Sequence, residues 1–85
     1  MDNVLHRFNL IVDYNENNIE LYTNSNRIIG RITYYIDKKS AYILSIYSNK
    51  NNDKYIYILL GLLAELLMYK NIDFIVFNDM SDIEL

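Results

Sequence analysis

The stretch Tyr55–Tyr69, YIYILLGLLAELLMY, constrains this chain more than any other part of the sequence. Its fifteen residues carry a single charge, Glu65. A surface helix shows an apolar stripe and a polar back, whereas a helix that is apolar all round must be covered on more than one side. We therefore predict a buried helix here. In so small a chain we expect burial on all sides to need a second subunit.

The same stretch is too short to cross a membrane. A helix rises about 1.5 Å per residue and needs roughly 20 apolar residues to span a bilayer. The stretch also lacks the charged opposite face of a helix that lies in the membrane surface. The sequence thus predicts no membrane partner. No basic segment followed by an apolar one opens the chain as in a secretory signal, and we expect a cytoplasmic protein.

Length and cysteine content limit how the fold can be stabilised. The chain has 85 residues and no cysteine. A domain of this size buries only about 60–65% of the surface of its unfolded chain, so its core is small. Without cysteine, neither a disulfide nor a thiolate zinc site can reinforce that core, and oligomerisation is the remaining common device. The sequence predicts a single domain, residues 1–85, that forms a homodimer.

The charge pattern argues against nucleic acid as a partner. The net charge is −3, with eleven acidic and eight basic residues, and the basic residues are scattered along the chain. Binding to phosphates needs clustered cations on a basic surface. The acidic balance favours a role in solubility, with an acidic face against a basic partner as the alternative.

The composition also carries a hint of origin. Asn, Ile, Lys and Tyr fill 39 of the 85 positions. Their codons are rich in adenine and thymine, which indicates an AT-rich genome such as that of a low-GC bacterium, a phage or some eukaryotic viruses. The nine tyrosines fit this bias as codon-favoured strand formers. They fit an interface equally, because tyrosine combines a large contact area with a polar tip.

Alternation of apolar and polar residues predicts three strands in the first half of the chain. In the first strand, apolar side chains occupy every second position from Phe8 to Tyr14, as expected of a half-buried strand. Turns rich in Asn and Ser separate the strands, because these residues bond their own backbone and Asn also accepts left-handed geometry. The predicted strands are Arg7–Tyr14, Ile19–Thr23 and Ile28–Asp37.

The second half predicts two central strands joined by the helix. Ala41–Ser48 and Ile72–Phe77 are apolar on both faces, which is typical of strands covered twice. Asn52 or Asp53 is expected to cap the start of the helix, since its oxygen can accept from the free amides of the first turn. Asn71 is expected to end it. A strand, helix and strand of these lengths form a right-handed crossover that places the two strands parallel.

The predicted fold class is therefore α+β. We expect a mostly antiparallel five-stranded sheet with one long apolar helix in a C-terminal crossover, in the order β-β-β-β-α-β, and an acidic tail that frays. One helix covers one sheet face, and no other predicted element covers the second. We expect a homodimer that buries this face or packs helix to helix. The expected interface residues are Tyr34, Tyr42, Tyr57, Leu60, Ala64 and Met68.

The order of elements from Phe8 to Phe77 resembles the core of the GCN5-related N-acetyltransferases. The resemblance is carried by IIGRITYYI in Ile28–Ile36, by AYILSIYS in Ala41–Ser48 and by the apolar helix before IDFIVF. In that family a bulged strand leads into a phosphate-cradling loop, a helix and a splayed strand. The resemblance implies this fold core and, for an active member, acetyl-CoA as cofactor.

The chain departs from the family at the phosphate-cradling loop. The family pattern R/Q-x-x-G-x-G/A uses glycines so that backbone amides can approach the pyrophosphate at a helix N-terminus. With Asn52 at the first position, Tyr55 and Tyr57 take the glycine positions, and a shift of one residue brings Ile56 and Ile58 there. The chain also stops where family members continue with another helix and two strands. The resemblance thus implies a truncated, degenerate relative that has lost cofactor binding.

The resemblance also indicates where acetyl-CoA would bind if it binds at all. Lys50 and Lys54 could attract a phosphate, although ordinary solvated charges are the alternative. The residues expected near the cofactor are Ile46, Ser48, Lys54, Tyr55 and Tyr57.

Other candidate sites have little support in the sequence. His6 is the only histidine, so a metal site or a Ser/His/Asp relay would rely on one residue near the terminus. Two carboxylates among Asp13, Glu16 and Glu20 could do acid and base work, which needs two acids at a set separation. No catalytic residue and no metal site is predicted.

Three environments are possible for the side chain of Glu65 on an otherwise apolar helix. It can reach the surface, pair with a cation such as Arg31, or be buried with a raised pKa.

Two classes of function remain. We expect a small non-catalytic protein-interaction module, such as an inhibitor or accessory protein of phage, virus or mobile-element origin. Such a chain would dock its sheet edge or its tyrosine-bearing face onto a partner protein. The alternative is a minimal acetyl-CoA-dependent N-acetyltransferase that uses backbone amides of Ala41–Ser48.

Overall fold

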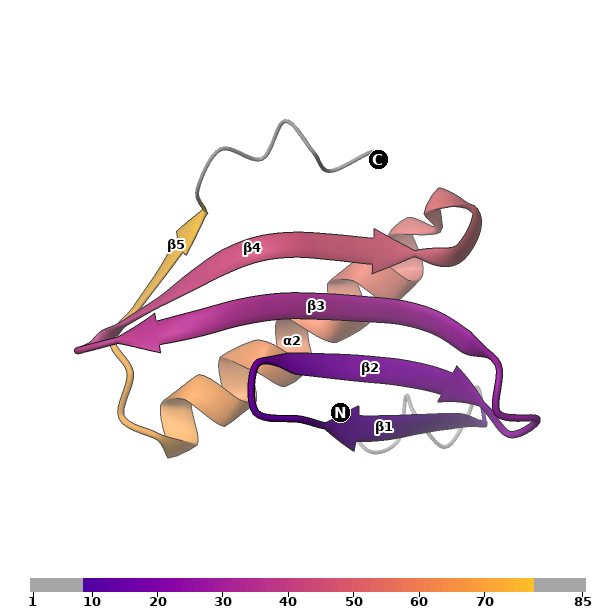
Figure 1. Cartoon of the computed structure of the whole chain (residues 1–85), viewed down its shortest axis with the longest axis horizontal. Coiled ribbons are helices and arrows are strands. Elements are labelled where there is room, and N and C mark those ends of the chain that lie inside the picture. Colours follow the sequence, from indigo (N-terminus) through magenta and orange to yellow (C-terminus); the bar gives the residue numbers. More distant parts are fainter. Residues whose placement is uncertain (1–8, 78–85) are drawn as a thin grey trace.

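The computed structural model describes residues 9–77. Figure 1 shows one curved sheet with one long helix across its back. The elements in chain order are β1 (Leu10–Tyr14), β2 (Asn18–Thr23), β3 (Ile28–Asp37), β4 (Ser40–Ser48), the short 3-10 helix η1 (Asn49–Asn51), α2 (Asp53–Tyr69) and β5 (Phe74–Phe77).

The strands lie in the sheet in the same order as in the chain, β1-β2-β3-β4-β5. β1 to β4 form antiparallel hairpins, and β5 pairs with β4 in parallel after the crossover through α2. The predicted α+β class, with a mostly antiparallel five-stranded sheet and the order β-β-β-β-α-β, is confirmed. The first two predicted residues of the first strand, His6 and the acidic tail lie outside the described residues.

The helix begins two residues before the predicted Tyr55–Tyr69. Asn52 is the N-cap, and its side chain accepts a hydrogen bond of 3.0 Å from the backbone N–H of Lys54. Of the two predicted caps, Asn52 is confirmed, whereas Asp53 is the first residue of the helix. An acid at this place is favoured by the positive end of the helix dipole.

Asn71 ends the helix, as predicted. It lies in the left-handed region, with φ of 60°. The N–H of Asn71 donates to the carbonyl of Met68 over 3.1 Å, and the N–H of Ile72 donates to that of Leu67 over 2.9 Å. These two bonds form the Schellman motif that closes many helices. Because Ile72 still belongs to this motif, β5 starts at Phe74 and is shorter than the predicted strand.

The core lies between α2 and the sheet face that it covers. Gly30 lets the helix approach closely, because a Cβ there would lie 3.1 Å from Cδ1 of Leu59. The buried side chains of the core come from β2, β3, β4 and one side of α2. They are Ile19, Leu21, Ile29, Ile32, Tyr34, Ala41, Ile43, Ile56, Ile58, Leu59, Leu62, Leu63 and Leu67.

The other side of α2 is exposed in the single chain. Tyr57, Met68 and Tyr69 expose 70%, 76% and 87% of their surface. The sheet thus covers the helix on one side only, and the all-round burial expected from its sequence does not occur within one chain. Among residues 9–77 there is no helix with the length and apolar character needed to cross a membrane.

Two bulges interrupt the alternation expected from the sequence. One lies in β3, where Leu21 pairs with Gly30 and Tyr22 with Ile28, so that Ile29 is the extra residue. The other lies in β4 at Leu44, because Thr33 pairs with Ser45 and Tyr34 with Ile43. A bulge adds one residue to one strand and moves later side chains to the other face. Ile29 is therefore buried and Leu44 exposed.

Candidate protein-interaction surface

The sheet face opposite α2 is covered by no other element of the described chain. We call it the open face. Residues paired across neighbouring strands share a face, and the register therefore identifies its members. They are Ile11, Asp13, Asn18, Glu20, Tyr22, Ile28, Arg31, Thr33, Tyr35, Asp37, Ser40, Tyr42, Ser45, Tyr47, Phe74 and Val76.

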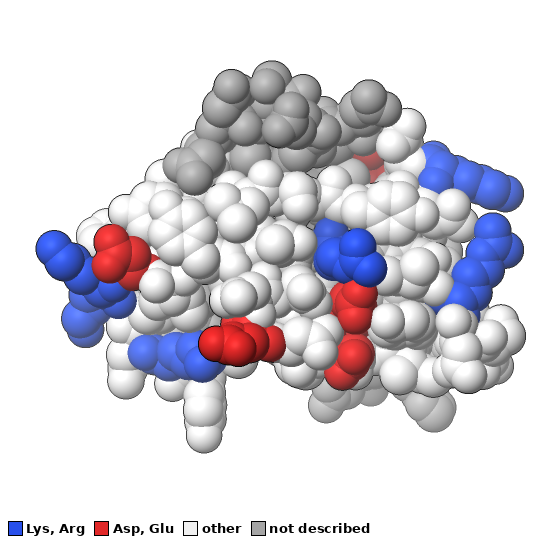
Figure 2. All heavy atoms as spheres, viewed as in Figure 1, with Lys and Arg blue, Asp and Glu red and all other residues white. Residues whose placement is uncertain are grey.

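Figure 2 shows this face directly, because the helix lies behind the sheet in that view. Most of the visible surface belongs to uncharged residues. Charged residues gather in a central group and towards the two ends. The open face therefore presents a broad neutral surface around one small charged group.

The central charged group is built around Glu20. Nε and Nη2 of Arg31 donate to Oε2 of Glu20 over 2.8 and 2.7 Å, whereas Tyr22 and Asn15 donate to Oε1 over 3.0 and 3.2 Å. The hydrogen bond from Arg31 is the main cause that lowers the pKa of Glu20. The hydrogen bond to Glu20 raises the pKa of Tyr22. Glu20 is thus a fixed carboxylate that orders three neighbouring side chains.

This arrangement bears on the prediction that two carboxylates among Asp13, Glu16 and Glu20 could do acid and base work. Asp13 lies opposite Glu20 in the β1–β2 register, and Glu16 is exposed in the turn between these strands. Acid and base work needs one carboxyl that holds a proton near neutral pH. Arg31 keeps Glu20 ionised instead, so the described geometry gives this group a structural role.

Glu65 takes the first of its predicted alternatives. It is exposed on α2. The predicted pairing of Glu65 with Arg31 is wrong, because the guanidinium of Arg31 binds Glu20 on the opposite face of the sheet.

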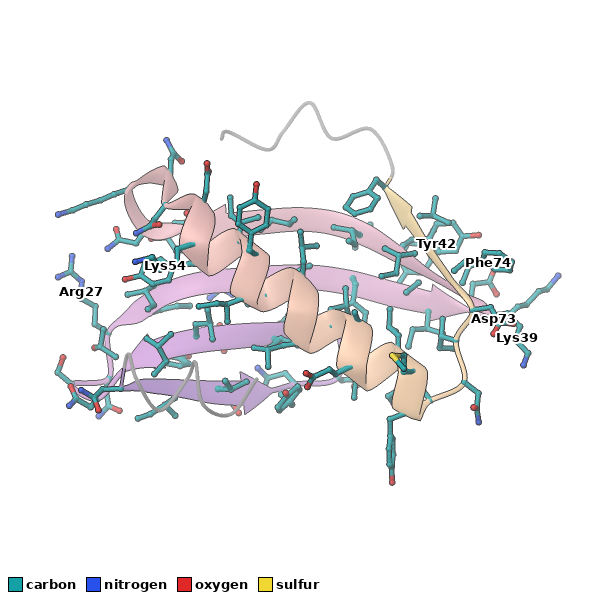
Figure 3. The ribbon with its side chains drawn as sticks, turned by 180° about the vertical axis from the view of Figure 1, so that it is seen from behind. Arg27, Lys39, Tyr42, Lys54, Asp73 and Phe74 are labelled. Atoms are coloured by element: carbon teal, nitrogen blue, oxygen red, sulfur yellow. The ribbon has the colours of Figure 1, made fainter. Side chains whose placement is uncertain are left out.

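Aromatic side chains occupy the end of the open face near the β3–β4 turn. The rings of Tyr35 and Tyr42 stack with centroids 4.8 Å apart and planes 12° apart. Tyr42 and Phe74 lie close to this turn in Figure 3. Phe74 is held there because its backbone N–H donates to the carbonyl of Lys39 over 3.1 Å. Tyr35 and Phe74 are exposed, so apolar ring surface faces solvent at a fixed position.

The predicted interface residues fall in three different places. Tyr34 lies in the core with 2% of its surface exposed, and burial raises its pKa. Tyr42 is half-buried on the open face. The other four share one side of α2 by their helical spacing, and we call them the outer stripe: Tyr57, Leu60, Ala64 and Met68.

The structure brings most of the predicted cofactor residues together around the start of α2. Ser48 is buried, and its hydroxyl donates to the carbonyl of Asn52 over 3.0 Å. The N–H of Lys54 donates to the Asn52 side chain, and the N–H of Tyr55 to the Asn52 carbonyl over 3.1 Å. An anion at a helix start needs such amides free, and Asn52 already occupies these two.

The side chains of Ile46, Tyr55 and Tyr57 differ in burial. Tyr55 is half-buried against the core, and so is Ile46. Tyr57 is exposed one turn into the helix. Tyr57 thus faces solvent, whereas Ile46 and Tyr55 pack against the core.

Basic residues divide between the two ends of the molecule. Arg27 and Lys54 lie at one end and Lys39 at the other, beside Asp73 (Figure 3). In the described part of the chain, Arg31 is the one cation of the open face, and its charge is matched by Glu20.

Several residues of the open face were not predicted from the sequence. Tyr35, Tyr47 and Phe74 are exposed there, and the Arg31–Glu20 pair was missed because its partners are eleven residues apart. Alternation along β3 does indicate the position of Tyr35, because it places Tyr35 and the apolar Ile32 on opposite faces of the strand. Phe74 carries none, because the short β5 is apolar on both faces.

Over residues 9–77 no three side chains of His, Cys, Asp or Glu gather in a way that could hold a metal ion. Comparison of the chain with models of protein families, with characterised proteins and with solved structures finds no match.

Proposed function

We propose that this chain is a small non-catalytic module that binds a partner protein through its open face. The observation that carries this proposal is the ordered tyrosine surface of the face, with Tyr35 stacked on Tyr42 and Tyr22 bonded to Glu20. Tyrosine held in one rotamer gives contact area at low entropic cost, and such residues are common anchors of protein interfaces.

The composition of the open face supports a protein partner. Beside tyrosine it carries Asn18, Thr33 and Ser45 along one row and a single arginine. Surfaces rich in Tyr, Ser and Asn with an occasional Arg are typical of antibody paratopes, where the small polar residues supply adaptable hydrogen bonds.

The charge of the open face argues for a neutral or weakly basic partner. Asp13, Glu20 and Asp37 stand against Arg31 alone. A nucleic acid would meet no excess of positive charge there. A protein surface that offers a lysine or arginine towards Asp13 fits better.

The size of the open face is sufficient for a stable complex. The molecule measures 36 × 28 × 18 Å, and the sheet face spans its two longer dimensions in Figure 1. A standard interface buries about 800 Å² on each partner. The open face can supply this area without help from another element.

The test compares capture of partner proteins by the wild-type chain and by variants of the open face. Tyr35→Ala removes a ring of the stack, and Thr33→Arg places a bulky charge in the middle of the face. We expect a specific captured protein whose Kd rises at least about tenfold with either variant, as for a central contact residue. Tyr57→Ala is the matched control, since it removes an exposed tyrosine from α2. Equal binding by all variants would contradict the proposal.

A second candidate function is a minimal acetyl-CoA-dependent N-acetyltransferase built on a degenerate GCN5-related core. One observation favours it: β4 has a bulge at Leu44, and its parallel neighbour β5 pairs with it only as far as Ile43. A bulged strand beside a splayed one is what the resemblance implies for that family. The capped amides at Asn52 count against it.

Thermal unfolding with acetyl-CoA separates the two functions. A ligand that binds only the folded chain adds about 2.7 kcal/mol to the free energy of unfolding at a concentration of 100 Kd. We expect no change in Tm, since the helix start offers no free cradle. A rise of several degrees that coenzyme A reproduces would favour the acetyltransferase.

A further inference from the structure

The outer edge of β4 is only half covered. β5 pairs with Ser40–Ile43, and β4 then continues for five more residues. On the β5 side of Leu44–Ser48, no strand of the described chain is paired with β4. Figure 1 shows β5 turning away from β4 at this point. The edge thus begins at the bulge, at Leu44. We call Leu44–Ser48 the free edge.

Apart from the bulge at Leu44, the free edge lacks, within the described chain, the features with which proteins protect such edges. Its sequence, LSIYS, has no charge and no proline. Natural sheets blunt an exposed edge with lysine, proline, inward charges or a covering element, because unpaired N–H and C=O groups otherwise pair with another chain. Leu44 and Tyr47 of this segment are also exposed, at 47% and 45%. The edge is therefore both accessible and suited to pairing.

We propose that the free edge binds an extended segment of a partner protein, which adds to the sheet as a strand beside β4. The physical reason is that a row of unpaired backbone donors and acceptors is matched in spacing only by another strand. Strand addition of this kind draws its affinity from main-chain hydrogen bonds and its specificity from alternate side chains.

The neighbours of the free edge define the chemistry of that segment. On the open face an added strand lies beside Ser45 and Tyr47. On the opposite face it lies beside the half-buried Ile46 and near Phe77, which pairs with Ile43 and exposes 53% of its surface. The segment should therefore carry apolar side chains at every second position, where they cover Ile46 and Phe77. The intervening positions, beside the hydroxyl groups of Ser45 and Tyr47, accept polar side chains.

This inference adds a second contact to the proposed function and does not depend on the tyrosines of the β3–β4 turn. The probe is a displayed library of unstructured twelve-residue peptides, selected against the full-length protein. The best binder is then synthesised with an N-methyl group at one position at a time. A strand uses its amides alternately, so we expect methylation to weaken binding at least tenfold at every second position and to be tolerated between them.

Variants of the protein locate the site. Leu44→Lys introduces an edge charge at an exposed position and should weaken peptide binding at least tenfold, whereas Tyr35→Ala on the open face should leave it unchanged. Circular dichroism of Leu44→Lys shows whether it is folded. If it is not, protection of the amides of Leu44–Ser48 from hydrogen exchange in the wild-type complex gives the same information.

The outcomes separate the two proposals. Peptide binding that resists Leu44→Lys, methylation that shows no period of two, or a library without binders would each overturn strand addition. None of these results touches the capture experiment with Tyr35→Ala, which tests the open face alone. Displacement of the peptide by acetyl-CoA would move the edge to the acetyltransferase function and overturn its role in protein binding.

Discussion

At the scale of single residues, Glu20 organises the open face. Its two oxygens accept hydrogen bonds from Arg31, Tyr22 and Asn15. Long side chains lose entropy when a partner binds, and a residue already held in place loses less. In the proposed function, the bonds of Glu20 therefore reduce the entropy that the open face loses when a partner binds.

The ion pair of Glu20 also predicts how stability depends on pH. Its pKa is lowered in the folded chain, chiefly by Arg31. The stabilisation is thus present above the ordinary Glu pKa of about 4.3 and is lost as the pH falls through the lower folded pKa. Glu20→Gln should cost about 0.5 kcal/mol at pH 7, a small value because Arg31 is 44% exposed. Urea unfolding at pH 7 and pH 3 measures both effects.

In this experiment the variant should lose less stability than the wild type between the two pH values. Glu16→Gln, at an exposed turn position, is the control and should follow the wild type. An identical loss in Glu20→Gln and wild type would show that the pair adds nothing.

Asn71 supports a second prediction at this scale. Its φ of 60° is unfavourable for residues with a branched Cβ, at a cost of about 1–2 kcal/mol. Asn71→Val should therefore lower the free energy of unfolding by this amount, whereas Asn71→Gly should be neutral or slightly stabilising. Chemical denaturation of the three proteins checks this, and a stable Asn71→Val would mean that the helix ends differently.

At the scale of elements, the sequence predicted the strands and the helix but not their irregularities. The predicted strand Ile28–Asp37 matches β3 in both bounds, because a long alternating run between two polar turns fits few structures other than a strand. The bulge at Ile29 was not predictable, and the resemblance implied a bulged strand without its position; both positions depend on the register of the neighbouring strand. The sequence predicted that one face of the sheet is left uncovered. The Tyr35–Tyr42 stack on this face could be identified only from the register of β3 and β4.

The one-sided burial of α2 gives a prediction for this element. Leu63 is fully buried and Tyr69 exposes 87% of its surface. Leu63→Ala should destabilise the chain by about 2–5 kcal/mol, because it leaves a cavity under the helix. Tyr69→Ala should stay within about 0.5 kcal/mol of wild type. Thermal or urea unfolding distinguishes them, and a similar cost for both would show that the helix is turned differently on the sheet.

At the scale of the whole molecule, the outer stripe of α2, in which Tyr57 and Met68 are exposed, motivates a prediction about assembly. Tyr57 and Met68 project from the two ends of the stripe, with the smaller Ala64 between them. We expect a homodimer that covers this stripe, because antiparallel helices pair large side chains with small ones. Light scattering at micromolar concentration should give twice the mass of the chain.

Ala64→Glu places a charge in the middle of the stripe and should shift the protein to the monomer without loss of helix by circular dichroism. Tyr35→Ala, on the open face, should leave the mass unchanged. A monomeric wild-type protein would contradict the predicted homodimer.

The agreement between strand order and chain order has a consequence during translation. Within β1 to β4, each strand pairs with the next one in the chain across a turn of two to four residues, and such local hairpins form early. The cover of their apolar face, residues 53–69, leaves the ribosome after all four of these strands. Until then Ile19, Leu21 and Ile32 have no partner layer, and nascent sheets on neighbouring ribosomes can adhere to one another. The speed of synthesis through the codons of residues 53–69 should therefore affect the yield of soluble protein.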